Sequence, residues 1–164
     1  NLVTVRAKPS AGDIFAYKMY HTFVCVAGVG RLIFSAIFLA LGIGTLGNID
    51  TYLSVIVLGI GLLNVLFSPL LFAYQAIKAA PALQPINYTF SEDKIVANDG
   101  KNRVELPWTG LALVVWLRKE LLIYTSPREA LVVPRRQMEG RDAEVLAIIK
   151  AHGNPSRTVI RKIW

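Results

Sequence analysis

The residues of this sequence that could catalyse a reaction or hold a metal ion are few and widely separated. His21 and His152 are the two histidines, and Cys25 is the one cysteine. Zinc and iron sites need several such ligands at short spacing, and the sequence has no Cys-x-x-Cys pair. It also has no phosphate loop of the G-x-x-x-x-G-K-[ST] kind and no G-x-S-x-G nucleophile elbow. We therefore expect no catalytic residue, no metal, no cofactor and no enzyme activity.

The cations are the remaining side chains that could recognise a ligand. They occur in small groups beside predicted turns and in the C-terminal segment, where Val, Ile and Trp accompany them. Near an anionic leaflet each such cation contributes about 1 kcal/mol of attraction. Nucleic-acid binding is not expected, because nothing in the sequence marks a platform of aromatic or arginine side chains on an accessible face. The predicted lipid or partner contacts are Arg135, Arg136, Lys101, Arg103, Arg118, Lys119, Arg157, Arg161, Lys162 and Trp164.

Two apolar segments dominate the first half of the chain. Hydrophobic residues make up 54% of the sequence and charged residues 18%, and the apolar excess lies between positions 22 and 77. Leu32–Ile49 and Thr51–Ile77 carry no charge, and a bilayer of about 30 Å needs roughly 20 helical residues. The short polar link around Asp50 predicts an antiparallel transmembrane hairpin over 22–78, with spans at about 24–47 and 52–74. A buried hairpin of a soluble protein is the alternative, but such helices have polar faces.

Small and polar residues inside the spans are the candidates for helix–helix contact. Small residues let helices approach closely in lipid, and an amide can hydrogen-bond across them. Pro69 is expected to kink or end the second span. The candidates for interhelical packing are Gly42, Gly44, Gly59, Gly61 and Asn64.

The charges around the two spans predict their orientation. Lysine and arginine flank the apolar region on both outer sides, whereas the link holds only Asp50. By the positive-inside rule this pattern favours a multi-pass protein of the bacterial inner membrane with both termini in the cytoplasm.

The segment before the spans, residues 1–21, predicts a short strand and an interfacial helix. Val3-Thr4-Val5 is a β-branched run that ends before Pro9. Ser10 and Asp13 have the spacing of a capping box for a helix that begins at about Ala11.

Residues 85–153 predict a small cytosolic β domain. Ile86, Tyr88 and Phe90 alternate with polar residues, and NDGKN at 98–102 is a strong hairpin signal. Five to seven short antiparallel strands are followed by an amphipathic helix that Gly153 ends. The expected fold class is membrane α+β, in which the hairpin precedes an antiparallel β domain of pleckstrin-homology-like (PH-like) type closed by a C-terminal helix. Residues 154–164 form a separate basic tail.

The sequence resembles the YcxB-like family of bacterial membrane proteins. The matching pieces are DIFAY at 13–17, the two apolar segments, YTFSED with Ile95, LPW at 106–108, and IYTSPREALVVPRRQM at 123–138. The resemblance implies two spans before a cytosolic PH-like domain, and it assigns no catalytic residue. The tail lies beyond the shared pattern.

These observations predict a non-enzymatic, membrane-anchored interaction or scaffold module. Its PH-like domain would bind a protein partner or anionic lipid. The alternative is an immunity-type or accessory protein whose spans bind a membrane-active toxin or a transporter subunit. Small residues in both spans leave a homodimer compatible with the sequence.

Overall fold

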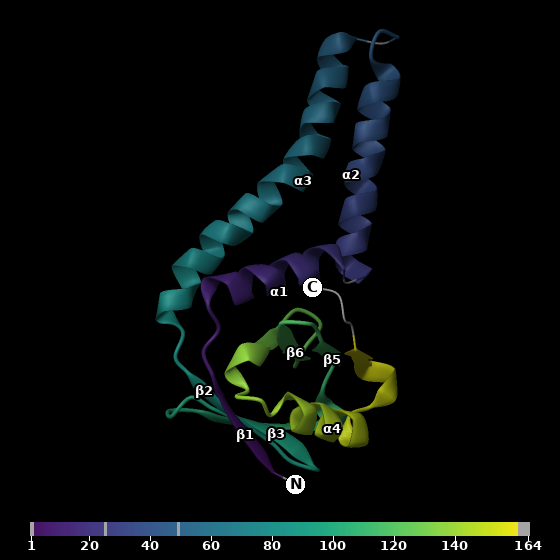
Figure 1. Ribbon diagram of the computed structural model, residues 1–164. Coiled ribbons are helices and arrows are strands. Elements are labelled where there is room, and N and C mark those ends of the chain that lie inside the picture. The colour runs from purple at the N-terminus through teal and green to yellow at the C-terminus, as the bar shows by residue number, and fades with distance from the viewer. Residues whose placement is uncertain (1, 25, 49, 161–164) are drawn as a thin grey trace. The chain divides into compact units, whose positions relative to one another are not determined.

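The computed structural model describes residues 2–24, 26–48 and 50–160 of the 164-residue chain. It combines helices with two four-stranded sheets, which confirms the α+β class (Figure 1). The chain divides into two compact units. The β unit comprises residues 1–13 and 80–164, and the helical unit comprises residues 14–79.

The first sheet of the β unit has the order β1-β2-β3-β4 and is antiparallel throughout. Val3 at the start of the chain lies opposite Phe90, so the two arms that flank the helical unit pair with each other. The Asp99 carboxylate accepts hydrogen bonds from the backbone N–H groups of Lys101 and Asn102, which fixes the predicted hairpin turn. The strands are β1 (Val3–Ala7), β2 (Ile86–Phe90), β3 (Lys94–Asn98) and β4 (Arg103–Pro107).

The second sheet has the order β7-β6-β5-β8. Its first three strands are antiparallel neighbours, whereas β8 is parallel to β5. Pro134 ends the edge strand β7, the position expected for a residue that cannot donate a ladder hydrogen bond. The strands are β5 (Leu113–Trp116), β6 (Glu120–Tyr124), β7 (Ala130–Pro134) and β8 (Thr158–Ile160).

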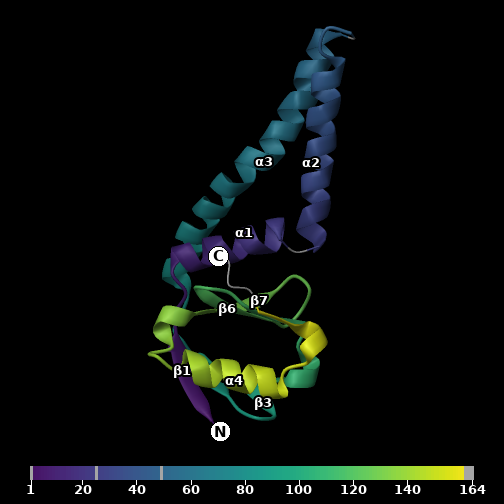
Figure 2. The ribbon, with the colours of Figure 1, turned by 45° about the vertical axis from the view of Figure 1, so that its right-hand side comes forward.

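The core of the β unit lies between the two sheets and α4 (Asp142–His152), as Figures 1 and 2 show. Helix α4 contributes Val145, Ile148 and Ile149, and it ends where the N–H of Gly153 donates to the carbonyl of Ile149. Trp108 and Trp116 are both buried in this core. Burial of large side chains at about 25 cal/mol per Å² of apolar surface is the main stabilising contribution to this unit.

The ends of the chain differ from the sequence-based division. Residues 1–21 were expected to stand apart from the β domain, but β1 completes its first sheet and buries Val3, Val5 and Ala7. Residues 154–164 were expected to be a separate tail, but Thr158–Ile160 is the fourth strand of the second sheet. In both pairings the two strands lie far apart in the sequence, so no local sequence pattern indicates that they pair.

The helical unit contains α2 (Val26–Thr45), α3 (Thr51–Ala79) and α1 (Ala11–Phe23) except for its first three residues, which belong to the β unit. Helices α2 and α3 lie side by side as the expected antiparallel hairpin (Figure 1). Asp50 caps α3, because its carboxylate accepts a hydrogen bond from the N–H of Tyr52 at 3.0 Å. Helix α3 continues through Pro69 to Ala79, so this proline does not end it.

One helix in the described part of the chain, Thr51–Ala82, is long and apolar enough to cross a membrane. The apolar part of α2 that meets the same composition, Val29–Thr45, is shorter. Only 11% of the most apolar window of Thr51–Ala82 is buried, which differs from the core helix of a soluble domain.

Packing in the hairpin places small residues inside and large apolar residues outside. The buried positions of α3 are Ser54, Gly61, Ser68 and Ala76, and those of α2 include Ser35 and Gly42. Most of them are seven residues apart, so they form one seam along each helix. The exposed side chains include Ile33, Phe34, Ile37, Leu41, Ile43, Leu53, Ile56, Leu63, Leu66, Phe67, Leu70 and Ile77. Soluble proteins bury such residues in preference to serine and glycine.

Candidate functional site

An open apolar groove lies beside the free edge of β4 in the β unit. Its volume is about 280 Å³. Val104 and Leu106 of β4 line it, together with Leu131 of β7. Val104 is 51% exposed, although it is apolar and lies within a strand. The other lining residues are Ile86, Ala97, Asp99, Asn102 and Thr125.

The free edge of β4 borders this groove, which we call the β4 groove. Among the strands that the structure describes, β4 pairs with β3 alone. An edge strand carries unpaired N–H and C=O groups, which pair readily with another extended chain. The β4 groove therefore offers backbone hydrogen bonds beside apolar side-chain contacts, the two elements of strand-addition binding.

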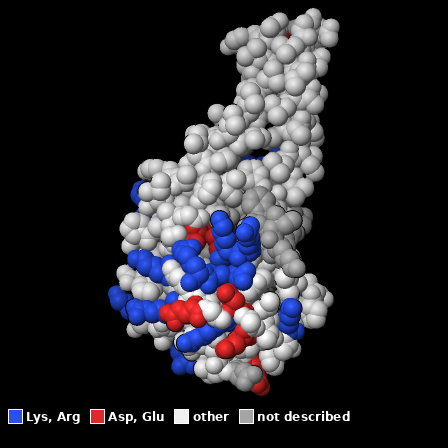
Figure 3. All heavy atoms as spheres, in the orientation of Figure 1, with Lys and Arg blue, Asp and Glu red and all other residues white. Residues whose placement is uncertain are grey.

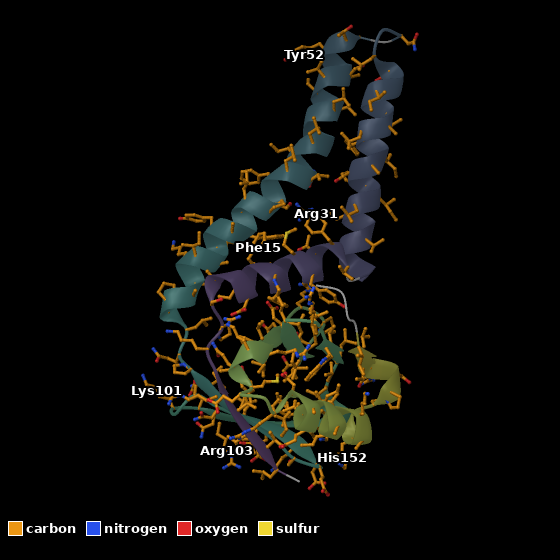
Figure 4. All side chains as sticks on the ribbon, viewed as in Figure 1. Phe15, Arg31, Tyr52, Lys101, Arg103 and His152 are labelled. Atoms are coloured by element: carbon orange, nitrogen blue, oxygen red, sulfur yellow. The ribbon has the colours of Figure 1, made fainter. Side chains whose placement is uncertain are left out.

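Charges of both signs lie on the outer face of β4. Glu105 forms salt bridges with Lys94 of β3 and, at 3.0 Å, with Arg103. All three side chains are at least 39% exposed, so these pairs contribute little to the stability of the fold. Lys101 and Arg103 lie at the outer part of the β3–β4 hairpin (Figure 4). The charged face is therefore available to a partner that approaches the edge.

A second polar cluster fixes the segment between β1 and α1. The buried Asp13 carboxylate accepts hydrogen bonds from both terminal nitrogens of Arg136, each at 2.6 Å, and from the N–H and hydroxyl of Ser10. The Ser10 contacts confirm the predicted capping box. Gln137 adds two hydrogen bonds to the backbone of Lys8, at 2.6 and 3.0 Å. We call Ser10, Asp13 and Arg136 the linker clamp.

Glu120 lies beside the linker clamp and is buried. Although it follows two exposed cations, Glu120 is 3% exposed, and its Oε2 has no hydrogen-bond partner among the described residues. The pKa of this carboxyl is raised to about 8, chiefly by burial and also by the negative charge of Asp13. The positive charges of Arg136 and Lys119 act to lower the pKa. Burial also acts to raise the pKa of Asp13, but hydrogen bonds from Arg136 and Ser10 outweigh it, and that pKa lies below its usual value. Neighbouring carboxyls thus prefer opposite protonation states at neutral pH.

The structure separates the predicted lipid or partner contacts into two groups. Arg135 donates to Asp142 and to two backbone carbonyls, and its guanidinium lies 4.7 Å from the centre of the Trp116 ring. Arg136 belongs to the linker clamp, and Arg157 donates to the carbonyl of Leu111 at 3.2 Å. These three side chains therefore stabilise the fold, and their exposed parts remain accessible to a ligand.

The remaining cations are exposed. Lys101, Arg103, Arg118 and Lys119 point to solvent at turns and on β4. On the face of the β unit in Figure 3, basic side chains gather with acidic ones between them, whereas the hairpin surface is almost free of charge. Arg161, Lys162 and Trp164 lie outside the described residues.

The expected interhelical contacts of the hairpin are present for some residues and not for others. A Cβ atom at Gly42 would lie 2.5 Å from Leu58, and one at Gly61 would lie 2.9 Å from Leu39, so both glycines allow close approach. At Gly44 and Gly59 a Cβ atom would meet no atom of the described residues within 4 Å, so packing among these residues does not require either glycine.

Polar contacts also join the helices of the helical unit. Arg31 reaches from α2 to α3, where it donates to Asn64 at 3.3 Å and to Ser68 at 2.7 Å (Figure 4). Ser54 donates to Thr45 at 2.9 Å near the other end of the hairpin. Such bonds hold α2 against α3 where large apolar side chains do not.

Within the described residues no three His, Cys, Asp or Glu side chains lie close enough together to hold a metal ion. The comparisons with family models, curated proteins and solved structures gave no match to this chain.

Sequence reasoning missed Val104, Leu106 and Glu120 as functional candidates. The alternation Arg103-Val104-Glu105-Leu106 indicated a strand, but nothing in it shows that the strand lies at an edge. The missing signal is the identity of the neighbouring strand, which depends on the whole topology.

Proposed function

We propose that this chain is a non-enzymatic, membrane-anchored interaction module of the bacterial inner membrane. Helices α2 and α3 lie in lipid, and the β unit is a PH-like domain on the cytoplasmic side. The β4 groove binds an extended segment of a protein partner. The order of motifs that resembles the YcxB-like family supports the same arrangement.

The observation that carries the proposal is the packing of the hairpin. Its seam contains serine and glycine, and its exposed surface contains leucine, isoleucine and phenylalanine. In water this arrangement would leave a large apolar surface uncovered, whereas in lipid the same surface contacts acyl chains. Interhelical hydrogen bonds from Arg31 and Ser54 fit helices that cannot bond to water.

The charge pattern supports the cytoplasmic side for the β unit. Lys18, Arg31 and Lys78 lie toward the ends of the hairpin that connect to the β unit, and Asp50 lies at the opposite end. Positive residues remain on the cytoplasmic side of bacterial membranes. Both chain arms enter the β unit, so both termini share that side.

The β4 groove supports binding and not catalysis as the activity of the domain. It combines an apolar hollow with an unpaired strand edge. Confinement to a membrane surface raises the local concentration of a second tethered molecule, so a small contact is sufficient for association.

Membrane fractionation of the full chain tests the anchoring. We expect it to stay with bacterial membranes through an alkaline carbonate wash and to enter solution only with detergent. Tags on either end should be protected from protease in intact spheroplasts. A chain that is monodisperse in buffer without detergent, or that has external tags, would overturn the proposal.

Exchange of the hairpin for an unrelated two-span hairpin tests which unit binds. A photo-reactive amino acid at Val104 should give the same crosslinked species in the exchanged and natural chains. The matched control is the same amino acid at Lys150, which is exposed on α4. Loss of the Val104 crosslink on exchange, with the β unit still folded, would instead favour a protein whose spans bind the partner.

A further inference from the structure

The free edge of β4 is complementary to a second copy of itself. Resting on the proposed function, we propose that the partner at the β4 groove is another molecule of this chain. The two β4 strands pair antiparallel about a twofold axis through Val104, which joins two four-stranded sheets into one sheet of twice that size.

The hydrogen bonds at the ends of the β3–β4 ladder show which residues are available at the edge. The N–H of Asp99 donates to Asn102, and the N–H of Trp108 donates to Asp93. Antiparallel ladders alternate between bonded and non-bonded pairs. Asn102 and Trp108 lie in bonded pairs, so every second residue between them, Val104 and Leu106, also directs its N–H and C=O groups toward β3. The residues that alternate with them, Arg103 and Glu105, direct their backbone groups outward.

Charge selects one register for two such strands. When two β4 strands pair antiparallel, the residues whose backbone groups point outward must lie opposite each other. This condition leaves three registers near the middle of the strand. One places Arg103 opposite Arg103 of the second copy, and another places Glu105 opposite Glu105. The third, centred on Val104, places Arg103 opposite Glu105 on both sides of the axis. Opposite charges across a strand pair are stabilising, and like charges are destabilising.

The same register brings the exposed apolar surface together. Val104 of each copy lies in a non-bonded pair, where side chains approach most closely. This contact covers the side chain that is 51% exposed in the single chain, and it extends the apolar wall of the β4 groove. The contact is small, but both copies are held in one membrane, which raises their effective concentration.

Disulfide formation at the axis is the primary test. The full-length chain carries Cys25→Ser and Val104→Cys and is reconstituted in liposomes. Two α-carbons in a non-bonded pair lie about 4.5 Å apart, within the range that a disulfide bridges. Mild oxidation should give a covalent dimer, whereas the matched chain with Lys150→Cys should remain monomeric.

Charge exchange tests the register. In the Val104→Cys background, Arg103→Glu alone and Glu105→Arg alone each place like charges opposite each other twice. We expect the crosslinked fraction to fall about tenfold in each. A mixture of the two variants, one carrying a size tag, should recover crosslinking only between unlike chains. Circular dichroism and melting curves should show that every variant is folded.

Lys150→Glu is the matched charge control, and it should leave crosslinking unchanged. The proposal is overturned if the Val104→Cys chain stays monomeric in liposomes, or if the charge variants crosslink as well as the parent. It is also overturned if Val104 crosslinks in cells to a different protein and not to this chain. In each of these cases, carbonate-resistant membrane retention would leave the proposed function intact.

Discussion

Two buried carboxyls in the β unit illustrate how neighbours decide the charge of a residue. Asp13 and Glu120 are both less than 5% exposed. Asp13 has a bidentate guanidinium partner and is ionised, whereas Oε2 of Glu120 has none among the described residues. An unpaired buried charge costs several kcal/mol, so the neutral acid is the stable form of Glu120 near neutral pH.

Glu120 should make the stability of the β unit depend on pH. Its folded-state pKa, about 8, exceeds the ordinary value of 4.5. The folded chain therefore binds more protons in this interval, and its free energy of unfolding falls as the pH rises from 4.5 to about 8. Glu120→Gln keeps the shape of the neutral acid and should remove this decline. Denaturant titrations of the detergent-solubilised chain across this pH range measure the effect.

Asp13 provides the opposite slope and an internal control. Its folded-state pKa lies below the ordinary value of 3.8, so its contribution is lost as the pH falls through the lowered pKa. Glu120→Gln should leave this acid limb in place. An equal decline above pH 4.5 in the parent and the variant would show that Glu120 ionises normally.

Arg136→Ala should destabilise the β unit through the linker clamp. Among the described residues, the change leaves the buried Asp13 carboxylate with Ser10 as its one hydrogen-bond partner. Hydrogen bonds to charged groups contribute about 1.5–3 kcal/mol, and the half-exposed Arg136 favours the lower part of that range, about 2 kcal/mol. Thermal melts of the full chain measure the loss.

Lys119→Ala is the matched control for Arg136→Ala, because Lys119 is an exposed cation in the same region. It should change the free energy of unfolding by no more than about 0.5 kcal/mol. A similar effect of both substitutions would indicate that net charge, and not the linker clamp, determines the stability.

Secondary-structure elements were predictable where their signals are local. The turn at 98–102 forms because Asp99 and Gly100 meet its geometry within five residues, and α4 ends at Gly153 as its sequence indicates. The pairing of β1 with β2, the addition of β8 to β5 and the contact between Asp13 and Arg136 were not predictable. Each joins segments more than 40 residues apart, and the choice among such pairings is made by the packing of the whole core.

The hairpin shows the same limit at the level of helix packing. The four glycines were equivalent candidates in the sequence, because small size is the only local signal. Only the rotation of α2 and α3 about their axes distinguishes Gly42 and Gly61 from Gly44 and Gly59. The seven-residue spacing that links Gly42 to Ser35, and Gly61 to Ser54 and Ser68, is the sequence signal that could have separated them.

Alanine substitution should separate the two pairs of glycines. At Gly42 the new Cβ would lie 2.5 Å from the side chain of Leu58 and 3.0 Å from its backbone nitrogen, so the helices must move apart. We expect Gly42→Ala to destabilise the hairpin by about 1 kcal/mol, as overpacking in a close contact does. Titration of the reconstituted chain with a denaturing detergent measures this change.

Gly59→Ala is the matched control, because a Cβ atom there lies within 4 Å of no atom in the described part of the chain. Its higher helix propensity should leave the hairpin unchanged or slightly more stable. If the two variants behaved alike, the seam through Gly42 and Gly61 would not be the contact between α2 and α3.

On the scale of the whole molecule, the proposed function assigns anchoring to the helical unit and recognition to the β unit. The β unit closes its own core from two arms, residues 1–13 and 80–164, and the helical unit is inserted between them. The hairpin interior contains small residues, and the core of the β unit contains large apolar ones. Under the proposed function, each unit has the packing that suits its surroundings, lipid for the helical unit and water for the β unit.

This division predicts that the β unit folds without the hairpin. A chain in which a flexible Gly/Ser linker of about 15 residues replaces residues 14–79 retains β1, the linker clamp and both sheets. We expect it to be monodisperse in buffer without detergent and to melt cooperatively, because its core residues are all present. Size-exclusion chromatography and circular dichroism measure both properties.

The informative control for the excised β unit lacks residues 1–7 as well. Without β1, the edge of β2 is unpaired, and the core loses Val3, Val5 and Ala7, each of which is at most 5% exposed. Removal of two buried valines and a full edge strand should cost more than the roughly 5 kcal/mol by which a small domain is stable, so this chain should aggregate or stay unfolded. If the shortened chain folded as well as the longer one, β1 would be dispensable and residues 1–13 would belong to the membrane anchor. If neither chain folded, the β unit would depend on the helical unit for its core.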